Sequence, residues 1–127
     1  MTDSIDRLYE AVLAARGAAP ASSRTARLLR AGRNKMAKKV AEEAVEVVID
    51  ALQNQRDAVV RESADLLYNL VVLWSSLDIH PADVWKEMNR RERLFGIAEK
   101  LIKERALAKA RRKVAPPARG VRKRRRY

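Results

Sequence analysis

Five carboxylates stand at regular spacings in two neighbouring stretches of the chain. The first stretch carries Glu42, Glu43 and Glu46, and the second carries Glu62 and Asp65. An ionised carboxylate is rarely buried without a partner, because removing it from water is expensive. Residues three or four positions apart lie on one side of a helix, so each stretch would present a row of acids along one face. Such rows need either water or a cation beside them.

A divalent metal ion is the cation that the composition favours. Carboxylates that converge from two helices repel one another in a low dielectric unless a cation lies among them. The chain has no cysteine and a single histidine, His80, which excludes thiolate sites and multi-histidine zinc sites. Oxygen ligands suit Mg²⁺, with Mn²⁺ as a substitute, and Mg²⁺ is often shared between protein carboxylates and substrate phosphates. We therefore expect phosphoanhydride hydrolysis, with a spare glutamate activating the water.

The alternative for Asp65 is a structural one. A single acid on a buried helix is commonly paired with a lysine or arginine in the core, and Asp65 could be such a residue. Two rows of paired acids on adjacent helices favour the metal site instead.

Helices must position these acids, because the hydrophobic periodicity predicts helices and no convincing strand. A connection of a few residues near Asn54 would make the two acid-bearing helices antiparallel neighbours. Gly32 would end the second helix, and Pro81 suits the first turn of the last one, which can continue past Gly96. The expected helices cover about residues 4–15, 23–29, 34–53, 56–77 and 82–96 or beyond.

The two acid-bearing helices are also unusually apolar. Apolar side chains cover well over half of the circumference of helix 34–53, and in helix 56–77 they point in nearly every direction between Ala64 and Trp74. Both helices are therefore expected to be covered on most sides. A chain of 127 residues has too few helices to do this alone, so we expect an all-α, four- to five-helix bundle that forms a homodimer.

The positive charge is confined to one end of the chain. The net charge is +12, and from Lys100 onward thirteen lysines and arginines face one acid, Glu104. We expect a helical domain at residues 1–99 and a basic extension at residues 100–127, helical at first and then disordered after Pro116 and Pro117. Weak contact with nucleic acid or another anion is the alternative role for this extension. No apolar stretch is long enough to span a membrane, so a cytoplasmic protein is expected.

The acid spacing carries a resemblance to a known family. The pattern E-E-x-x-E at Glu42, Glu43 and Glu46, followed by E-x-x-D at Glu62 and Asp65, resembles the signature of the MazG-like all-α nucleoside triphosphate pyrophosphohydrolases. The longer frame is similar to the phosphoribosyl-ATP pyrophosphohydrolase family of histidine biosynthesis. That frame runs from SSRTARLLRAGRNKMAKKVAEEAVEVV through ESADLLYNLVVLW to DVWKEMNRR, about residues 22–91.

The resemblance implies a dimeric helical bundle with sites at the subunit contacts. It also implies Mg²⁺-dependent cleavage of phosphoribosyl-ATP to phosphoribosyl-AMP and pyrophosphate. By position, Glu43, Glu46, Glu62 and Asp65 match the metal-binding acids of the family. Glu42 matches a further catalytic acid that orients water or a second ion.

Five other positions bear on the substrate. Lys38 and Lys39 are candidates for binding the triphosphate, or alternatively form ion pairs with the glutamates one turn later. The family usually has histidine where Asn69 stands, glycine where Ala41 stands and an aromatic residue where Arg24 stands. Because Asn69 lies on the acid row, its identity bears on substrate contact. A paralogue acting on another nucleoside triphosphate is therefore the runner-up function.

A nucleic-acid-binding module that kept the fold and lost the chemistry is a second alternative. The basic extension supports it, whereas the five acids oppose it, because carboxylates without metal repel phosphates. Deletion of the residues after Arg112 would separate the two functions.

Overall fold

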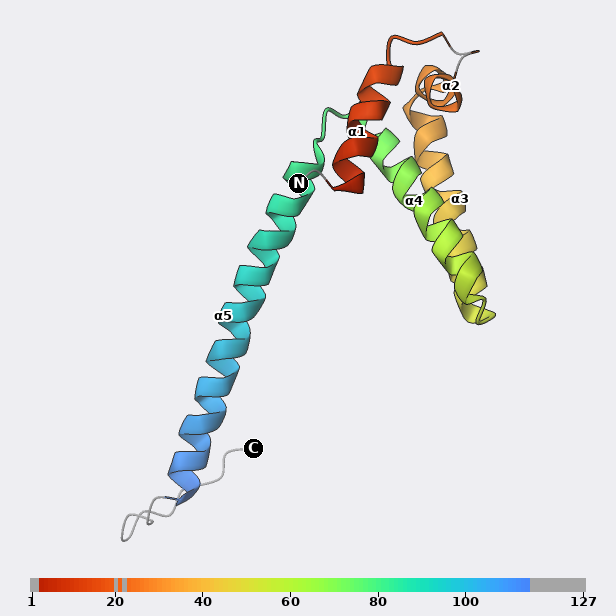
Figure 1. The fold of residues 1–127 in the computed structure, drawn as a ribbon. Helices are drawn as coiled ribbons and strands as arrows, with labels where there is room; N and C mark the ends of the chain where they lie inside the picture. Colours follow the sequence, from red (N-terminus) through yellow and green to blue (C-terminus); the bar gives the residue numbers. More distant parts are fainter. Residues whose placement is uncertain (1–2, 20, 22, 115–127) are drawn as a thin grey trace. The chain divides into compact units, whose positions relative to one another are not determined.

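The computed structural model describes residues 3–19, 21 and 23–114, which form helices and, within these ranges, no strand (Figure 1). The prediction of an all-α fold is confirmed. Predictions about residues 115–127 lie outside the described part of the chain. The helices are α1 (Ser4–Ala15), α2 (Arg24–Ala31), α3 (Arg33–Leu52), α4 (Arg56–Ser76) and α5 (Pro81–Val114).

Local sequence signals set the beginnings of the first two helices. The Asp3 side chain accepts a hydrogen bond of 2.8 Å from the backbone N–H of Asp6 and caps α1. Ser23 caps α2 in the same way, through a hydrogen bond of 2.9 Å from Ala26 N–H. A side-chain oxygen at this position satisfies one of the free N–H groups of the first turn. Gly32 separates α2 from α3 with φ at +98°, a conformation that favours glycine.

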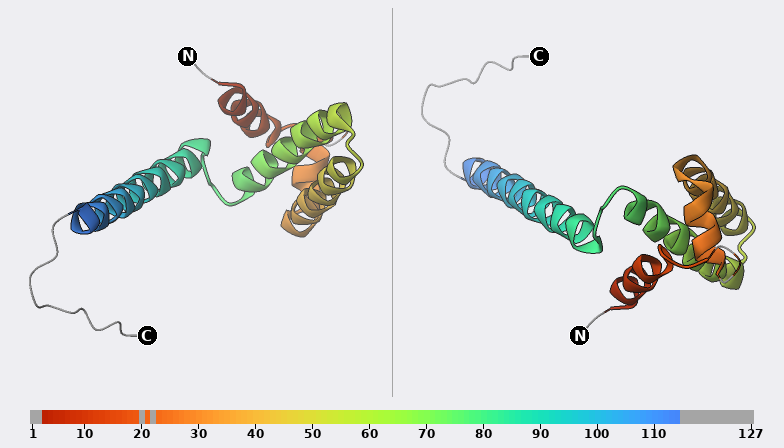
Figure 2. Two further views of the ribbon diagram at one scale, coloured as in Figure 1. Left: turned by 90° about the horizontal axis from the view of Figure 1, so that it is seen from below. Right: turned by 90° about the horizontal axis from the view of Figure 1, so that it is seen from above.

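Helices α3 and α4 form an antiparallel hairpin, in which they lie side by side (Figures 1 and 2). Only Gln53, Asn54 and Gln55 connect them. Asn54 adopts a left-handed backbone conformation with φ at +56°, which asparagine tolerates better than most residues. Gln55 N–H donates a hydrogen bond of 2.9 Å to Asp50 O and closes the turn. The acid rows of the two helices are thereby brought to one hairpin.

The apolar core lies where α1 and α2 pack against the hairpin. Its buried members come from four helices, and Val71 and Val72 of α4 are fully buried. The first turns of α5 contact the same unit through an edge-to-face pair of Trp85 and Trp74, with ring centroids 6.3 Å apart. The buried core residues are Tyr9, Val12, Leu28, Met36, Val71 and Val72.

Within one chain the hairpin is not covered on most sides, in line with the expectation that this chain has too few helices to cover it alone. In α3, the side chains of Val45, Val48 and Ile49 are each about half exposed, and Leu52 is 79% exposed. Val60 and Leu67 of α4 are exposed as well. The physical reason is that α1 and α2 pack near one end of the hairpin and leave these side chains uncovered.

The chain divides into two compact units, residues 1–86 and 87–127. In the second unit the described residues continue α5 as a helix through Gly96 to Val114. Near its start, the Glu87 carboxylate accepts hydrogen bonds from Arg90 and Arg91 at 2.7–3.1 Å. These arginines lower the pKa of Glu87 to about 2, so this carboxylate stays ionised. No helix in the described ranges is both long and apolar enough to cross a bilayer.

Candidate metal and nucleotide site

Three acids of the hairpin converge on one point. Carboxylate oxygens of Glu43 on α3 and of Glu62 and Asp65 on α4 all lie within 4.8 Å of one another, and each residue is half-buried. The helical spacing explains this arrangement, because Glu62 and Asp65 stand three residues apart on the face of α4 that meets α3. The arrangement has the size and the hard oxygen donors of a divalent cation site.

Two of these carboxylates contain oxygens without any partner. Oε2 of Glu43 and Oε2 of Glu62 are buried, and no described group donates a hydrogen bond to either. A buried oxygen without a partner loses its hydration with nothing in return, which destabilises the fold. A divalent cation between the two helices would satisfy both oxygens. The residues present therefore fit the metal ion that their chemistry suggests.

Glu46 belongs to the same cluster through its contact with Glu62. The close approach of the Glu46 carboxyl group, followed by that of Glu43 and by partial burial, raises the pKa of Glu62 to about 7. When carboxyl groups lie close together, ionising all of them costs electrostatic free energy, so one of them keeps its proton to a higher pH. Without a cation, Glu62 thus carries a proton at mildly acidic pH. The four acids proposed as ligands from the sequence all lie in this one region.

Asp65 has no basic partner that would make it a structural core acid. Among residues 3–19, 21 and 23–114, no lysine or arginine forms an ion pair with its carboxylate. Its backbone oxygen accepts a hydrogen bond of 2.9 Å from Nδ2 of Asn69. This observation favours the metal-ligand interpretation of Asp65 over the structural one.

Glu42 lies apart from the three converging acids. It is exposed, and its carboxylate pairs with Lys39 at 3.6 Å. The sequence had suggested ion pairs at i, i+4 for Lys38 and Lys39, but the pair that forms is at i, i+3. Lys38 is exposed and forms no ion pair with any described acid.

A cation-rich cavity of about 260 Å³ lies next to the acid cluster. Asn69 connects the two, because it lines the cavity and bonds to the backbone of Asp65 one turn earlier. Its side chain is 1% exposed, and its buried Oδ1 has no described partner. The lining residues are Arg24, Arg27, Leu28, Ala31, Lys35, Lys39 and Asn69.

Three cations that line the cavity are not predicted from the sequence. The sequence pattern gives no role to Arg27 or Lys35, and it marks Arg24 only as a departure from the family pattern. The Arg24 guanidinium lies 5.5 Å from the centre of the Tyr68 ring, a cation–π contact that holds it at the cavity. The available signal was the i, i+3 spacing of Arg24 and Arg27, which places two cations on one face of α2.

Comparisons with known proteins agree with this chemistry. A family model described as "Phosphoribosyl-ATP pyrophosphohydrolase" matches residues 5–92. The chain is 63% identical to "Phosphoribosyl-ATP pyrophosphatase 2" of Rhodopseudomonas palustris, over 98% of this chain and 100% of that protein. It is 68% identical to the protein of the same name from Bradyrhizobium diazoefficiens, over 81% of this chain and 77% of that protein. A "Phosphoribosyl-ATP pyrophosphatase" of Granulibacter bethesdensis is 46% identical over 84% of this chain and 66% of its own length.

Proposed function

Because this chain belongs to the phosphoribosyl-ATP pyrophosphohydrolase family, we propose that it hydrolyses phosphoribosyl-ATP to phosphoribosyl-AMP and pyrophosphate in histidine biosynthesis. The observation that carries the proposal is the pair of unpartnered, buried carboxylate oxygens of Glu43 and Glu62 beside a cavity lined by cations. Acids that hold a divalent cation and cations that hold phosphates are the two parts that phosphoanhydride hydrolysis requires.

The acids of the hairpin are the proposed metal ligands. Glu43, Glu46, Glu62 and Asp65 would hold Mg²⁺, with Mn²⁺ as a substitute, because they supply only hard oxygen donors. When bound, the ion neutralises phosphate oxygens and lowers the pKa of water. To bind the ion, Glu62 must release the proton that its neighbours Glu43 and Glu46 stabilise, so the affinity for the metal depends on pH.

The cavity residues are proposed to hold the substrate phosphates. Lys39 lies at the edge of the cavity, since it lines the cavity and also forms an ion pair with Glu42. Lys38, on the same turn, is the second sequence-derived candidate for a phosphate contact. Asn69 offers a buried, unpartnered Oδ1 to the cavity, which suits a donor group of the substrate. This residue is therefore proposed to contribute to substrate selection.

Glu42 is proposed to orient the attacking water. The water oxygen adds to the α-phosphorus, and the bond from this phosphorus to the oxygen that bridges the α- and β-phosphates breaks. Pyrophosphate leaves with the bridging oxygen. The proton of the water passes to a carboxylate. A base positioned in this way contributes about 10²–10⁴-fold to the rate.

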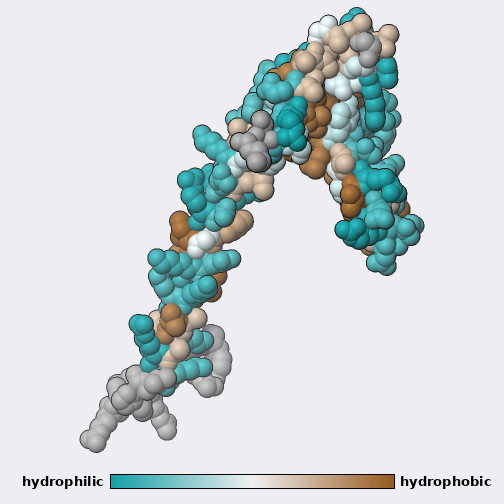
Figure 3. Space-filling model, viewed as in Figure 1, coloured by the Kyte–Doolittle hydropathy of each residue, from teal (hydrophilic) through white to brown (hydrophobic). Residues whose placement is uncertain are grey.

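The assembly proposed for this enzyme is a homodimer. Six large apolar side chains of the hairpin are exposed in the single chain, and a second copy would cover them. Figure 3 shows hydrophobic surface among the polar residues of the chain. The six side chains are Val45, Val48, Ile49, Leu52, Val60 and Leu67.

The cytoplasmic location expected from the sequence stays a prediction.

The deciding experiment is pyrophosphate release across a panel of nucleotides. Purified protein with Mg²⁺ should release pyrophosphate, and no orthophosphate, from phosphoribosyl-ATP, and chelation with EDTA should stop the reaction. A higher kcat/KM for another nucleoside triphosphate would identify the chain as a paralogue of different specificity. Absence of turnover on every nucleotide would overturn the proposed chemistry and favour a binding module.

A further inference from the structure

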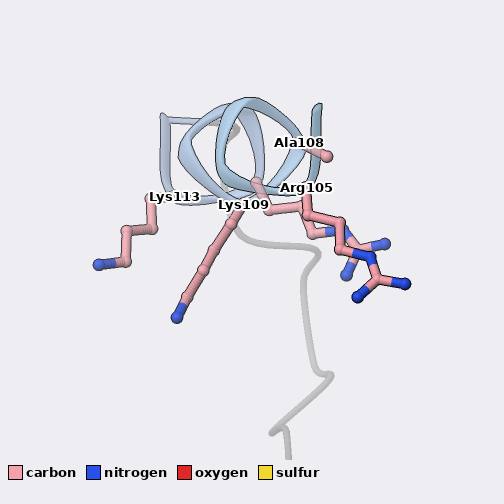
Figure 4. Close-up of a pocket in the computed structure, with 5 residues that line it drawn as sticks. Arg105, Ala108, Lys109 and Lys113 are labelled. Atoms are coloured by element: carbon pink, nitrogen blue, oxygen red, sulfur yellow. The ribbon is translucent and has the colours of Figure 1, made fainter. Parts of the chain in front are cut away.

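The C-terminal part of α5 presents a row of cations along one face, formed by residues that the hydrolytic site does not use. Arg105, Lys109, Arg112 and Lys113 stand at positions i, i+4, i+7 and i+8, which fall on one side of a helix. They line one surface pocket together with Ala108. Figure 4 shows the side chains of Arg105, Lys109 and Lys113 extending from the same side of the helix.

These four charges are not neutralised by the described part of the chain. None of them forms an ion pair with a described acid. The two arginines near the start of the second unit differ, because Arg90 and Arg91 are both bonded to Glu87. Residues 87–127 contain sixteen lysines and arginines against four acids. The distal face of α5 is thus a free cationic surface beyond residue 92, where the family match ends.

We propose that this face, formed by Arg105, Lys109, Arg112 and Lys113, binds the phosphate backbone of double-stranded DNA without sequence preference. An α-helix with side chains is about 10–12 Å wide, and the major groove of B-DNA is about 12 Å wide and admits one. The row spans eight residues, about 12 Å along the helix, so its cations can reach several phosphates.

The residue types of this face decide between the possible polyanions. Binding of single strands relies on aromatic side chains that stack on bases, and residues 96–114 contain none. The major groove of A-form RNA is too narrow and deep to admit a helix. Asparagine and glutamine, which read adenine in the major groove, are also absent from residues 96–114. Of the polyanions considered, the phosphate backbone of duplex DNA fits these residue types best.

An anionic membrane fits this face less well. A helix that lies in a membrane interface needs large apolar side chains beside its basic ones. Between Lys103 and Lys113 the only large apolar residue is Leu107, which stands two positions from Arg105 and Lys109 and therefore on another side of the helix. The other large apolar side chains that α5 exposes in this region, such as Leu101 and Ile102, precede the four cations instead of alternating with them. The cationic face itself offers only Ala108 between its charges.

A matched pair of double variants tests the proposal with the full-length protein. Lys109→Gln/Arg112→Gln removes two charges from the cationic face, and Arg90→Gln/Arg91→Gln removes two charges that are already paired with Glu87. Binding of a fluorescent 24-base-pair duplex of arbitrary sequence is measured by anisotropy between 50 and 200 mM salt. Each phosphate contact contributes about 0.9 to the slope of log K against log salt.

The proposal requires that Lys109→Gln/Arg112→Gln lowers this slope by about 2 and weakens binding, while Arg90→Gln/Arg91→Gln leaves the slope nearly unchanged. Circular dichroism and pyrophosphate release should be the same in Lys109→Gln/Arg112→Gln as in the wild type, which separates this result from any failure of the hydrolytic assignment. Equal effects of both variants, or no duplex binding at 50 mM salt, would overturn it. Binding to phosphatidylserine vesicles in preference to duplex would overturn it in favour of a membrane.

Discussion

The side-chain amide of Asn69 donates a hydrogen bond of 2.9 Å to the backbone oxygen of Asp65, one turn earlier on α4. This bond fixes the amide at the wall of the cavity, with its Oδ1 buried and without a described partner. A residue of the acid row is thereby shared between the acid cluster and the cavity wall.

Asn69→Leu should weaken substrate binding more than it weakens the fold. Leucine has nearly the same size and removes the unpartnered oxygen, so the free energy of unfolding should change by no more than about 1 kcal/mol. The KM for phosphoribosyl-ATP should rise about tenfold with a smaller change in kcat. Steady-state kinetics and urea melts measure both, and an unchanged KM would remove Asn69 from the substrate site.

Asp65→Asn should abolish Mg²⁺-dependent pyrophosphate release while the helices stay folded. Loss of one ligand charge should reduce the rate by about a hundredfold or more. Without metal, the variant should melt slightly higher than the wild type, because one repelling charge is gone, and Mg²⁺ should stabilise it less. If Asp65 were a structural partner of a base, the variant would instead lose about 3 kcal/mol and ignore Mg²⁺.

Lys39→Gln and Lys38→Gln form a matched pair. Lys39 lines the cavity and forms an ion pair with Glu42. Lys38 is exposed, does not line the cavity and forms no ion pair with a described acid. The first variant should raise the KM for phosphoribosyl-ATP several-fold, and the second should change it less, since an exposed cation is screened by salt. Kinetics at 0.15 M salt would test this, and equal effects would show that both lysines contact the phosphates.

The stability of the metal-free protein should fall as the pH rises from about 4.5 to about 7. Within this window the folded protein keeps the proton of Glu62, whose pKa is raised from 4.5 to about 7, and the unfolded chain has released it. The folded state therefore binds more protons than the unfolded state, so raising the pH favours unfolding. Thermal melts in EDTA should show this trend, and Glu62→Gln should flatten it. An identical trend in that variant would assign it to other groups.

The protein should behave as a homodimer that depends on the apolar hairpin surface. Val48→Lys places a charge at a side chain that is 56% exposed in the single chain, where a partner would have to bury it. Sedimentation velocity should show a dimer for the wild type and a monomer for this variant. Lys86→Glu, a charge change on the exposed surface of another helix, serves as the control. A wild-type monomer at all concentrations would contradict the prediction.

Local signals in the sequence were sufficient for the helices. Gly32 was expected to end the short second helix, with Ser22 or Ser23 capping its start, and in the structure α2 lies between Ser23 and Gly32. Helix α1 covers the expected residues 4–15, because the apolar side chains of its stripe and the Asp3 cap at its start are close together in the sequence. Such signals depend on neighbours along the chain, and for that reason they can be read without knowing the packing.

The cavity could not be predicted in the same way. Arg24 and Lys35 lie on different helices, and their shared cavity depends on how α2 packs against α3 across Gly32. Periodicity gives the face of each helix but not the angle between helices. The placement of Glu43, Glu62 and Asp65 was predictable because one short turn sets that angle. The packing of one chain leaves the six apolar hairpin residues exposed, and their covering by a second copy stays a prediction.

The short Gln53–Gln55 connection has a consequence for the order of folding. All the proposed metal ligands lie between Glu43 and Asp65, on the two arms of one hairpin. Contacts between residues close in sequence form early, because little chain entropy is lost in closing a short loop. We therefore expect the carboxylates to come together before α1 packs on the hairpin, so that their mutual repulsion opposes an early step of folding. Mg²⁺ present during synthesis would remove that repulsion and act as a nucleation partner for the chain, so metal depletion should slow refolding as well as stop turnover.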